Sequence, residues 1–393
     1  MFPLIYWLTL SSSFVLLVPS LVLLVEALAA QFSQSPTQNS DTQRPRLAVL
    51  IPAHNEELEI QQTLLGVLPE LEAGDRLIVI ADNCTDTTAT VARSTGATVI
   101  ERQDPARRGK GYALDYGLQF LQADPPEIVV FVDADCQVQP GTIAQLAQQA
   151  RQFSTPVQSI YLMETPAHPS PKDRVSAFAF KVKNWVRPLG LWRLGLPCLL
   201  TGTGIAIPWA IVHQVHWATG NIVEDMALGL DFALAGYPPH LSPNSLVWGR
   251  LPRREEAART QRTRWEQGHL QTLATYGPKL LTAALARRQP MLLAIALDLC
   301  VPPLSFLVML VAGFACVATA VGTLGISWVP ATTMGLAGGC LAGGILLAWN
   351  RFGRSDLPLK DLLAVPLYIL WKIPLYFKLL VKPQRTWVRT ERG

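Results

Sequence analysis

The sequence predicts an α/β domain with a mostly parallel β-sheet, flanked by transmembrane helices. Two observations predict this class. In the central part of the chain, short apolar runs alternate with helical patterns, which is typical of a buried parallel sheet. The two ends of the chain are far more apolar, and they raise the hydrophobic share of the 393 residues to 50%. That composition does not fit an ordinary soluble enzyme.

Residues 1–30 predict a transmembrane helix. Glu26 is their only charged residue, and a spanning helix needs about 20 apolar residues. A cleaved signal peptide is the alternative, because residues 27–29 resemble a cleavage site, but no Lys or Arg precedes the apolar run. Residues 31–45 then predict a polar linker to the central domain.

The C-terminal part predicts two more transmembrane helices in residues 290–350, and an interfacial amphipathic helix with a basic tail in residues 351–393. Lys372 and Pro374 interrupt the last apolar stretch, which therefore suits the membrane interface better than a span. Clusters of Lys and Arg flank the apolar segments, and such clusters favour the cytoplasmic side. We therefore expect a multi-pass plasma membrane protein whose central domain, residues 46–289, is cytoplasmic.

The net charge and the spacing of the cysteines argue against nucleic-acid binding and against a cysteine metal site. The net charge is +4, and no basic stripe interleaved with aromatic residues appears, so we attribute the charge to the membrane and expect no nucleic-acid partner. No pair of the six cysteines has metal-ligand spacing, and three lie in apolar segments. We expect free thiols in a reducing compartment.

Polar residues follow three of the expected strands. The expected strands of the central domain are Leu47–Ile51, Leu77–Ile80, Thr98–Ile100 and Glu127–Val132. Asn55, Asp82 and Asp133 each stand shortly after a strand end. Because ligands of parallel α/β sheets bind beyond the carboxyl ends of the strands, these residues are expected to share one crevice.

The segment Asp133-Ala134-Asp135 predicts a metal site. Residues i and i+2 of an extended segment point to the same side, so both carboxylates can face one ligand. Mg²⁺ or Mn²⁺ prefers such oxygen ligands, and a divalent metal is the usual partner of a nucleotide diphosphate. A solvated turn is the alternative for this motif alone.

Two other turns predict nucleotide contacts. In Pro52-Ala53-His54-Asn55-Glu56, Pro52, Asn55 and Glu56 are expected near the base or ribose, and Asp82 can accept a hydrogen bond from a base N–H. Helix capping is the alternative for Asn55 and Asp82. Lys110 stands in a basic turn bounded by glycines; we expect it near the nucleotide, with a solvated loop as the alternative.

Two further motifs predict the chemistry and the acceptor. Glu224-Asp225 opens a helical stretch and supplies a general base for a hydroxyl that attacks a sugar. Favourable placement of acids in a first helical turn is the alternative. Gly202 and Thr203 belong to a Gly-x-Gly segment that suits close approach of the backbone to an acceptor, or simply a tight turn.

The motif Gln261-x-x-Arg264-Trp265 is the most distinctive one. On a helix, its three named residues share one face. Arg264 can offset the charge of a pyrophosphate leaving group, with Gln261 beside it, and Trp265 offers a flat apolar floor for an acceptor sugar. An amphipathic interfacial helix is the alternative.

With these motifs in this order, the chain resembles the membrane-integrated family 2 glycosyltransferases, which include cellulose, chitin, hyaluronan and poly-N-acetylglucosamine synthases and ceramide glucosyltransferases. The resemblance covers about residues 46–269. It implies a GT-A fold, inversion at the anomeric carbon and a metal-dependent nucleotide-sugar donor. It also makes Asp225 the base, Asp135 the metal ligand, and Asp82 with Glu56 the uridine contacts.

We therefore expect a glycosyltransferase that moves a hexosyl or N-acetylhexosaminyl group from a UDP-sugar to a polysaccharide or lipid-linked glycan. Its expected partners are the donor, that acceptor and membrane lipid; the sequence names no export partner. Val223 stands where many processive members have Thr, which leaves single addition to a glycolipid as the alternative. A nucleotidyltransferase would not need the motifs from Glu224 onward, and a membrane transporter or scaffold would not need Asp82, Asp133 and Asp135 at strand ends.

Overall fold

The computed structural model describes residues 2–32, 44–166, 168–218, 224–250 and 255–362, and the single residues 365, 368, 369, 372, 373 and 376. The chain divides into two compact units. An α/β unit holds the described residues of 44–164 and 197–268. A helical unit holds those of 2–32, 165–196 and 269–376. The boundary at residue 268 falls within one long helix.

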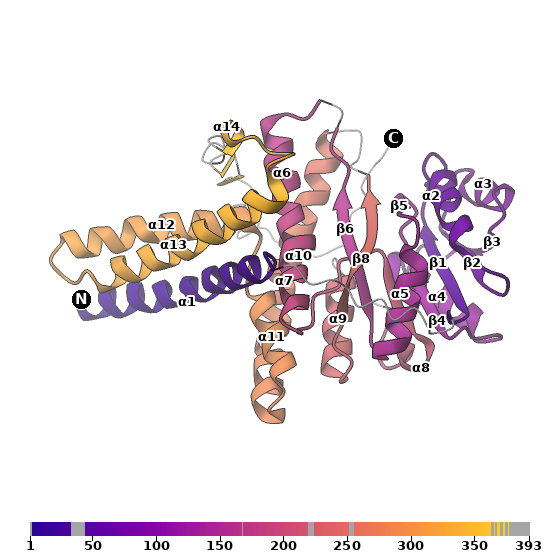
Figure 1. The fold of residues 1–393 in the computed structure, drawn as a ribbon, viewed down its shortest axis with the longest axis horizontal. Coiled ribbons are helices and arrows are strands. Elements are labelled where there is room, and N and C mark those ends of the chain that lie inside the picture. The colour runs from indigo at the N-terminus through magenta and orange to yellow at the C-terminus, as the bar shows by residue number, and fades with distance from the viewer. Residues whose placement is uncertain are drawn as a thin grey trace. The chain divides into compact units, whose positions relative to one another are not determined.

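Among the described residues, eight strands form one sheet in the order β3-β2-β1-β4-β7-β6-β8-β5 (Figure 1). The strands are β1 (Leu47–Ala53), β2 (Arg76–Asp82), β3 (Thr98–Arg102), β4 (Ile128–Phe131), β5 (Cys136–Val138), β6 (Val157–Met163), β7 (Ile205–Pro208) and β8 (His240–Gly249). β1 pairs in parallel with β2 and β4, and β2 with β3. These are the four expected strands, so the predicted α/β fold with a mostly parallel sheet is confirmed.

The other half of the sheet mixes strand directions. β7 runs antiparallel to both β4 and β6, whereas β6 and β8 are parallel and β5 is antiparallel to β8. The helices of this unit are α2 (Ile60–Val67), the 3₁₀ turn η1 (Leu68–Glu70), α3 (Thr88–Ser94), α4 (Lys110–Leu121), α5 (Thr142–Phe153), α8 (Trp209–Val212) and α9 (Glu224–Leu234).

One core holds the parallel strands to the helices. Alternate strand residues point to one face, as the pleat requires, and among them Leu50, Ile80 and Phe131 pack with Leu118 of α4 and Phe232 of α9. Each of these side chains is at most 2% exposed, and full burial of such a side chain stabilises a fold by about 1.5–3 kcal/mol. This core fixes the strand ends from which the polar loops leave.

The helical unit contains the apolar segments. Its elements are α1 (Phe2–Ala29), α6 (Pro171–Lys181), the π-helix η2 (Val182–Val186), α7 (Arg187–Arg193), the C-terminal part of α10 (Glu255–Arg287), α11 (Pro290–Leu299), α12 (Leu304–Thr323), α13 (Val329–Ala348), the π-helix η3 (Trp349–Gly353) and α14 (Leu359–Leu362). α1 packs against α13 and α12.

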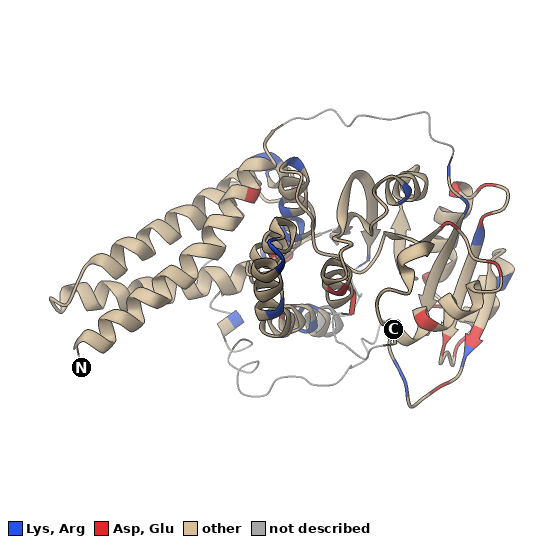
Figure 2. Ribbon diagram, turned by 90° about the horizontal axis from the view of Figure 1, so that it is seen from below, with Lys and Arg blue, Asp and Glu red and all other residues tan. Residues whose placement is uncertain are grey.

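Three of the described helices are long and apolar enough to cross a membrane, namely Pro3–Ala29, Leu304–Thr323 and Val329–Gly353. Figure 2 shows that they carry no charged residue over most of their length. The expected block 290–350 thus holds two such helices, preceded by the short helix α11. Pro302 and Pro303 separate α11 from α12, because proline removes a helical hydrogen bond. Most of the expected interfacial helix and basic tail lies outside the described residues.

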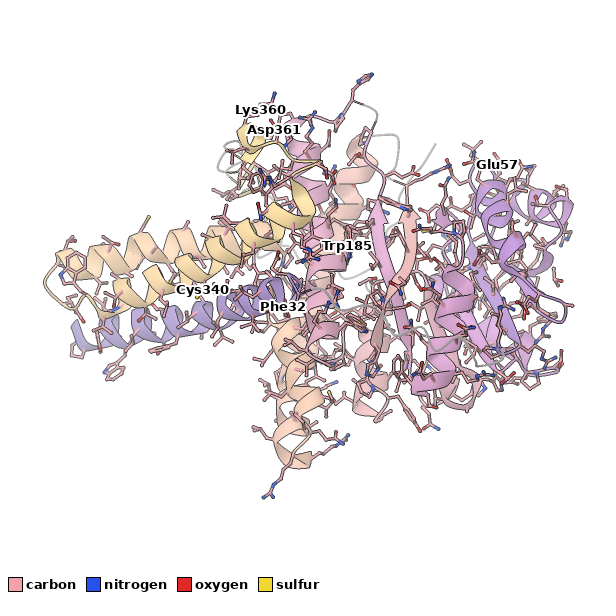
Figure 3. All side chains as sticks on the ribbon, viewed as in Figure 1. Phe32, Glu57, Trp185, Cys340, Lys360 and Asp361 are labelled. Carbon is pink, nitrogen blue, oxygen red and sulfur yellow. The ribbon has the colours of Figure 1, made fainter. Side chains whose placement is uncertain are left out.

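Buried ion pairs join the parts of the helical unit. Glu26, the single charge of the first apolar segment, accepts a hydrogen bond from Arg187 Nε at 2.9 Å, and Arg187 also pairs with Asp298. All three side chains are at most 5% exposed, so each charge is compensated where water cannot reach it. In the same unit, Asp361 of α14, which is labelled in Figure 3, accepts a hydrogen bond from Arg174 of α6 at 2.6 Å.

Candidate active site

The site lies in the α/β unit, at the carboxyl ends of the parallel strands. Because β1 pairs in parallel with both β2 and β4, the three strands end at one edge of the sheet. Asn55 follows β1, Asp82 is the last residue of β2, and Asp133 follows β4. The structure therefore places these three predicted residues at the same edge.

Asp82 is held by Asn83, the next residue along the chain, and by Arg102, which the sequence motif did not include. Its carboxylate is 8% exposed, and its Oδ1 accepts hydrogen bonds from Arg102 Nη1 at 2.6 Å and from Asn83 Nδ2 at 2.9 Å. Arg102 lies directly opposite Asp82 in the register of β2 and β3. His54 Nδ1 lies 2.6 Å from the carbonyl oxygen of Asp82, so this histidine holds the backbone of the loop.

The loop after β1 is tied to the loop after β2. Asn55 has a φ of +56°, and its side chain donates to Thr85 Oγ1 at 3.0 Å and accepts from Thr85 N at 2.7 Å. Glu56 N donates to Thr88 Oγ1 at 2.8 Å, and Pro52 lies within β1. These bonds give Asn55 a structural part in joining the loops, and nucleotide contacts by Pro52, Asn55 and Glu56 stay predictions.

The Asp-x-Asp segment forms a group that could hold a metal ion. Ligand atoms of Asp133, Asp135 and Cys136 all lie within 4.8 Å of one another. Burial, followed by the charges of Asp135 and Asp133, raises the pKa of the Cys136 thiol, so this side chain is neutral at physiological pH. The charged ligands are thus two carboxylates, and these residues fit the oxygen preference of Mg²⁺ or Mn²⁺. Cys136 was not among the predicted ligands.

Lys110 connects this group to the Gly-x-Gly loop. It is the first residue of α4, its Nζ pairs with Asp133, and Nζ donates to the carbonyl oxygen of Gly202 at 2.6 Å. Burial alone would lower the pKa of Lys110, but the charges of Asp133 and Glu224 outweigh it and raise that pKa above its usual value. Lys110 is therefore a fixed cation beside the predicted metal ligands.

Glu224 and Asp225, the acid pair, are the first two residues of α9 and lie next to the same loop. Gly202 has a φ of +102°, and a Cβ placed there would lie 3.0 Å from Asp225 Oδ2, so the glycine leaves room for this carboxylate. Burial and the charge of Asp225 raise the pKa of Glu224 to about 7, although Lys110 and Arg264 act in the opposite direction. The Glu224 carboxyl is therefore largely protonated below neutral pH.

A pocket that is open to solvent lies between α4, the Gly202 loop and α9. Lys110, Gly202, Glu224 and Asp225 line it on the polar side. Its apolar lining includes Phe131 and Trp217, whose ring centroids are 4.9 Å apart. A pocket with charged groups on one side and aromatic rings on the other suits a small-molecule substrate.

The remaining predicted motif lies on α10, as expected for a helix. Gln261 is buried, and Arg264 and Trp265 are half-buried. Arg264 lies close enough to Glu224 for its positive charge to lower the pKa of that carboxyl. This places Arg264 toward the acid pair. The acceptor contact of Trp265 stays a prediction.

Comparison with known proteins identifies the fold that carries this site. A family model described as "Glycosyltransferase like family 2" matches residues 45–268, which is more than half of the chain. The chain belongs to this glycosyltransferase family. Its α/β unit is therefore GT-A-like, and it contains every predicted site residue.

Relatives of this family 2 glycosyltransferase are distant. The probable glycosyltransferase YdaM of Bacillus subtilis (strain 168) is 27% identical over 240 residues, which are 57% of this chain and 55% of that protein. Glucosyl-3-phosphoglycerate synthase of Mycobacterium tuberculosis (strain H37Rv) is 37% identical over 95 residues, or 23% of this chain and 28% of that protein. The chain thus spans about half, or less, of the length of these curated relatives.

A solved structure supports the fold over nearly the whole chain. Mannosyltransferase PcManGT from Pyrobaculum calidifontis, solved in complex with GDP-Man and Mn²⁺, has a TM-score of 0.55 and 19% sequence identity. The similarity covers 95% of this chain and 100% of that chain. At 19% identity, this similarity supports the fold alone.

Proposed function

We propose that this family 2 glycosyltransferase is an inverting enzyme that transfers a sugar from a nucleotide diphosphate sugar, expected to be a UDP-sugar, to a lipid-linked or polysaccharide acceptor at the membrane. The observation that carries the proposal is the convergence at one pocket of Lys110, Glu224 and Asp225, with Lys110 paired to Asp133. The three long apolar helices support a membrane setting, with the catalytic unit on the cytoplasmic side.

The chain's own residues divide the work as follows. Asp225 takes the proton of the acceptor hydroxyl. At the same time, the hydroxyl oxygen of the acceptor attacks the anomeric carbon, and the bond from that carbon to the diphosphate breaks. Lys110 and Arg264 offset the charge of the departing diphosphate. Asp82 accepts a hydrogen bond from the base N–H. A divalent metal held by Asp133 and Asp135 would supply further charge neutralisation at the diphosphate.

A screen of nucleotide sugars tests the proposal. Protein purified in lipid nanodiscs would be incubated with a panel of UDP-, GDP- and ADP-sugars, Mn²⁺ and a lipid extract. We expect one UDP-sugar to give release of UDP together with a glycosylated product. Release of a nucleoside monophosphate or pyrophosphate would indicate a nucleotidyltransferase, and no turnover of any donor would contradict the proposal.

The raised pKa of Glu224 predicts a pH effect on the donor. Below about pH 7 this carboxyl is neutral; as the pH rises through 7 it gains a negative charge in a pocket that must accept an anionic donor. We expect the KM for the donor to rise roughly threefold or more between pH 6 and 8.5. Glu224→Gln should flatten this dependence, and an unchanged slope in the variant would assign the effect to another group.

A further inference from the structure

The buried side chain of Gln158 forms hydrogen bonds with the backbone of the Gly-x-Gly loop, residues 201–204. Gln158 lies in β6 and is 1% exposed. Its Nε2 donates to the carbonyl oxygens of Thr203 at 2.8 Å and Ser159 at 2.9 Å, and its Oε1 accepts from Thr201 N at 2.8 Å. A buried amide costs free energy unless it is hydrogen-bonded. Gln158 and the backbone of the loop therefore satisfy each other.

The loop of residues 201–204 is fixed against β6 in one conformation. Gly202 and Gly204 have φ values of +102° and +63°, which glycine adopts at little cost. Ser159 N donates to the carbonyl oxygen of Gly204 at 2.8 Å, and a Cβ on Gly204 would lie 2.0 Å from Ser159 Oγ. The loop has no room to move toward β6.

The same loop contacts three of the residues expected to take part in the transfer. Gly202 accepts the hydrogen bond of Lys110 at 2.6 Å. Thr203 Oγ1 accepts from Asp133 N at 3.0 Å. The Cα of Gly202 packs beside the Asp225 carboxylate. A displacement of the loop would therefore move Lys110, Asp133 and Asp225 relative to one another.

We propose that Gln158 is a positioning residue for glycosyl transfer, which holds the 201–204 loop and through it the relative placement of Lys110, Asp133 and Asp225. Gln158 is not among the residues that line the pocket, so it acts through the loop. This inference rests on the proposed function.

Gln158→Glu tests the proposal through the pH profile. A neutral Glu keeps the acceptor for Thr201 N and offers an O–H donor to Thr203, whereas a carboxylate has no donor. Burial raises the pKa of a carboxyl, and position 158 is 1% exposed, so the introduced carboxyl should be neutral at pH 6 and ionised by pH 8.5. We therefore expect kcat near that of the wild type at pH 6 and a fall of roughly tenfold or more, relative to wild type, by pH 8.5. Melting temperatures at both pH values would show whether the variant stays folded.

Two variants complete the test. Gln158→Leu removes the hydrogen bonds to Thr201 and Thr203 and should lower kcat by a similar factor at all pH values. We expect a smaller change in the KM for the donor, because the predicted nucleoside contact at Asp82 does not touch the loop. Gln122→Glu, on the exposed end of α4, is the matched control and should follow the wild-type profile.

The outcomes separate this inference from the proposed function. A folded Gln158→Leu variant whose kcat stays within twofold of the wild type would overturn the positioning role. If neither Gln158 variant folds, Gly204→Ala displaces the same loop from the Ser159 side and should lower kcat in the same way; normal turnover in that variant overturns the role as well. A wild-type protein that turns over no nucleotide sugar would instead contradict the proposed function.

Discussion

Asp225→Asn is expected to lower turnover by a factor of about 10² or more while leaving nucleotide affinity nearly unchanged. Asp225 lies in the pocket at the start of α9, against a glycine that leaves room for its carboxylate. Its neighbour Glu224 has a pKa raised to about 7, so at neutral pH a large fraction of the Glu224 carboxyl is already protonated and cannot accept the proton of the acceptor. The amide keeps the shape of the side chain and loses the base.

Single-turnover transfer and UDP binding, measured on the same preparation, decide this assignment. Asp124→Asn is the control, because this exposed carboxylate pairs with Arg46 at the opposite edge of the sheet and should leave kcat unchanged. Removing the charge of Asp225 also lowers the pKa of Glu224, which can then act as a weak substitute. The double variant with Glu224→Gln should therefore lose the residual turnover. Near-normal turnover in Asp225→Asn would rule out Asp225 as the base.

The first half of the fold could be predicted because its signals are local. β1 to β4 are short apolar runs, and each of the first three is followed by a helix with its own period. The three long apolar helices follow from composition alone. The sequence also placed Asp82 and Asp133 at one edge, because the carboxyl ends of parallel strands meet there.

The second half of the fold depends on contacts between distant segments. β6 pairs with β8 across residues 157–163 and 240–249, and the α/β unit is interrupted by residues 165–196, which belong to the helical unit. No local pattern encodes this order. The sequence therefore gave no indication that the sheet becomes mixed after β4.

The supporting residues of the site were missed for the same reason. Arg102 meets Asp82 only through the register of β2 and β3, and Gln158 meets the loop at Thr201 and Thr203 across 43 and 45 residues of sequence. Neither belongs to a motif. A basic residue on the neighbouring strand, directly opposite a predicted acidic site residue, is a signal that could have identified Arg102 as a partner of Asp82.

Removal of the divalent metal is the second change for which we expect a large loss of glycosyl transfer. We expect chelation of divalent ions to abolish transfer and added Mn²⁺ or Mg²⁺ to restore it, because the donor brings closely spaced negative charges to a site that already holds Asp133, Asp135 and the acid pair. Lys110 is the cation paired with Asp133, so that carboxylate is partly neutralised. The metal should depend more strongly on Asp135.

Asp135→Ala should therefore raise the Mn²⁺ concentration for half-maximal transfer by roughly tenfold or more, and weaken donor binding by a comparable factor. Mn²⁺ binding can be followed directly by the loss of the free-ion electron paramagnetic resonance signal, independently of activity, with Asp124→Ala as the control. Mn²⁺ affinity equal to that of the wild type would move the ligand role away from Asp135. Full transfer in excess chelator would remove the metal from the reaction, and Lys110 with Arg264 would then have to neutralise the diphosphate unaided.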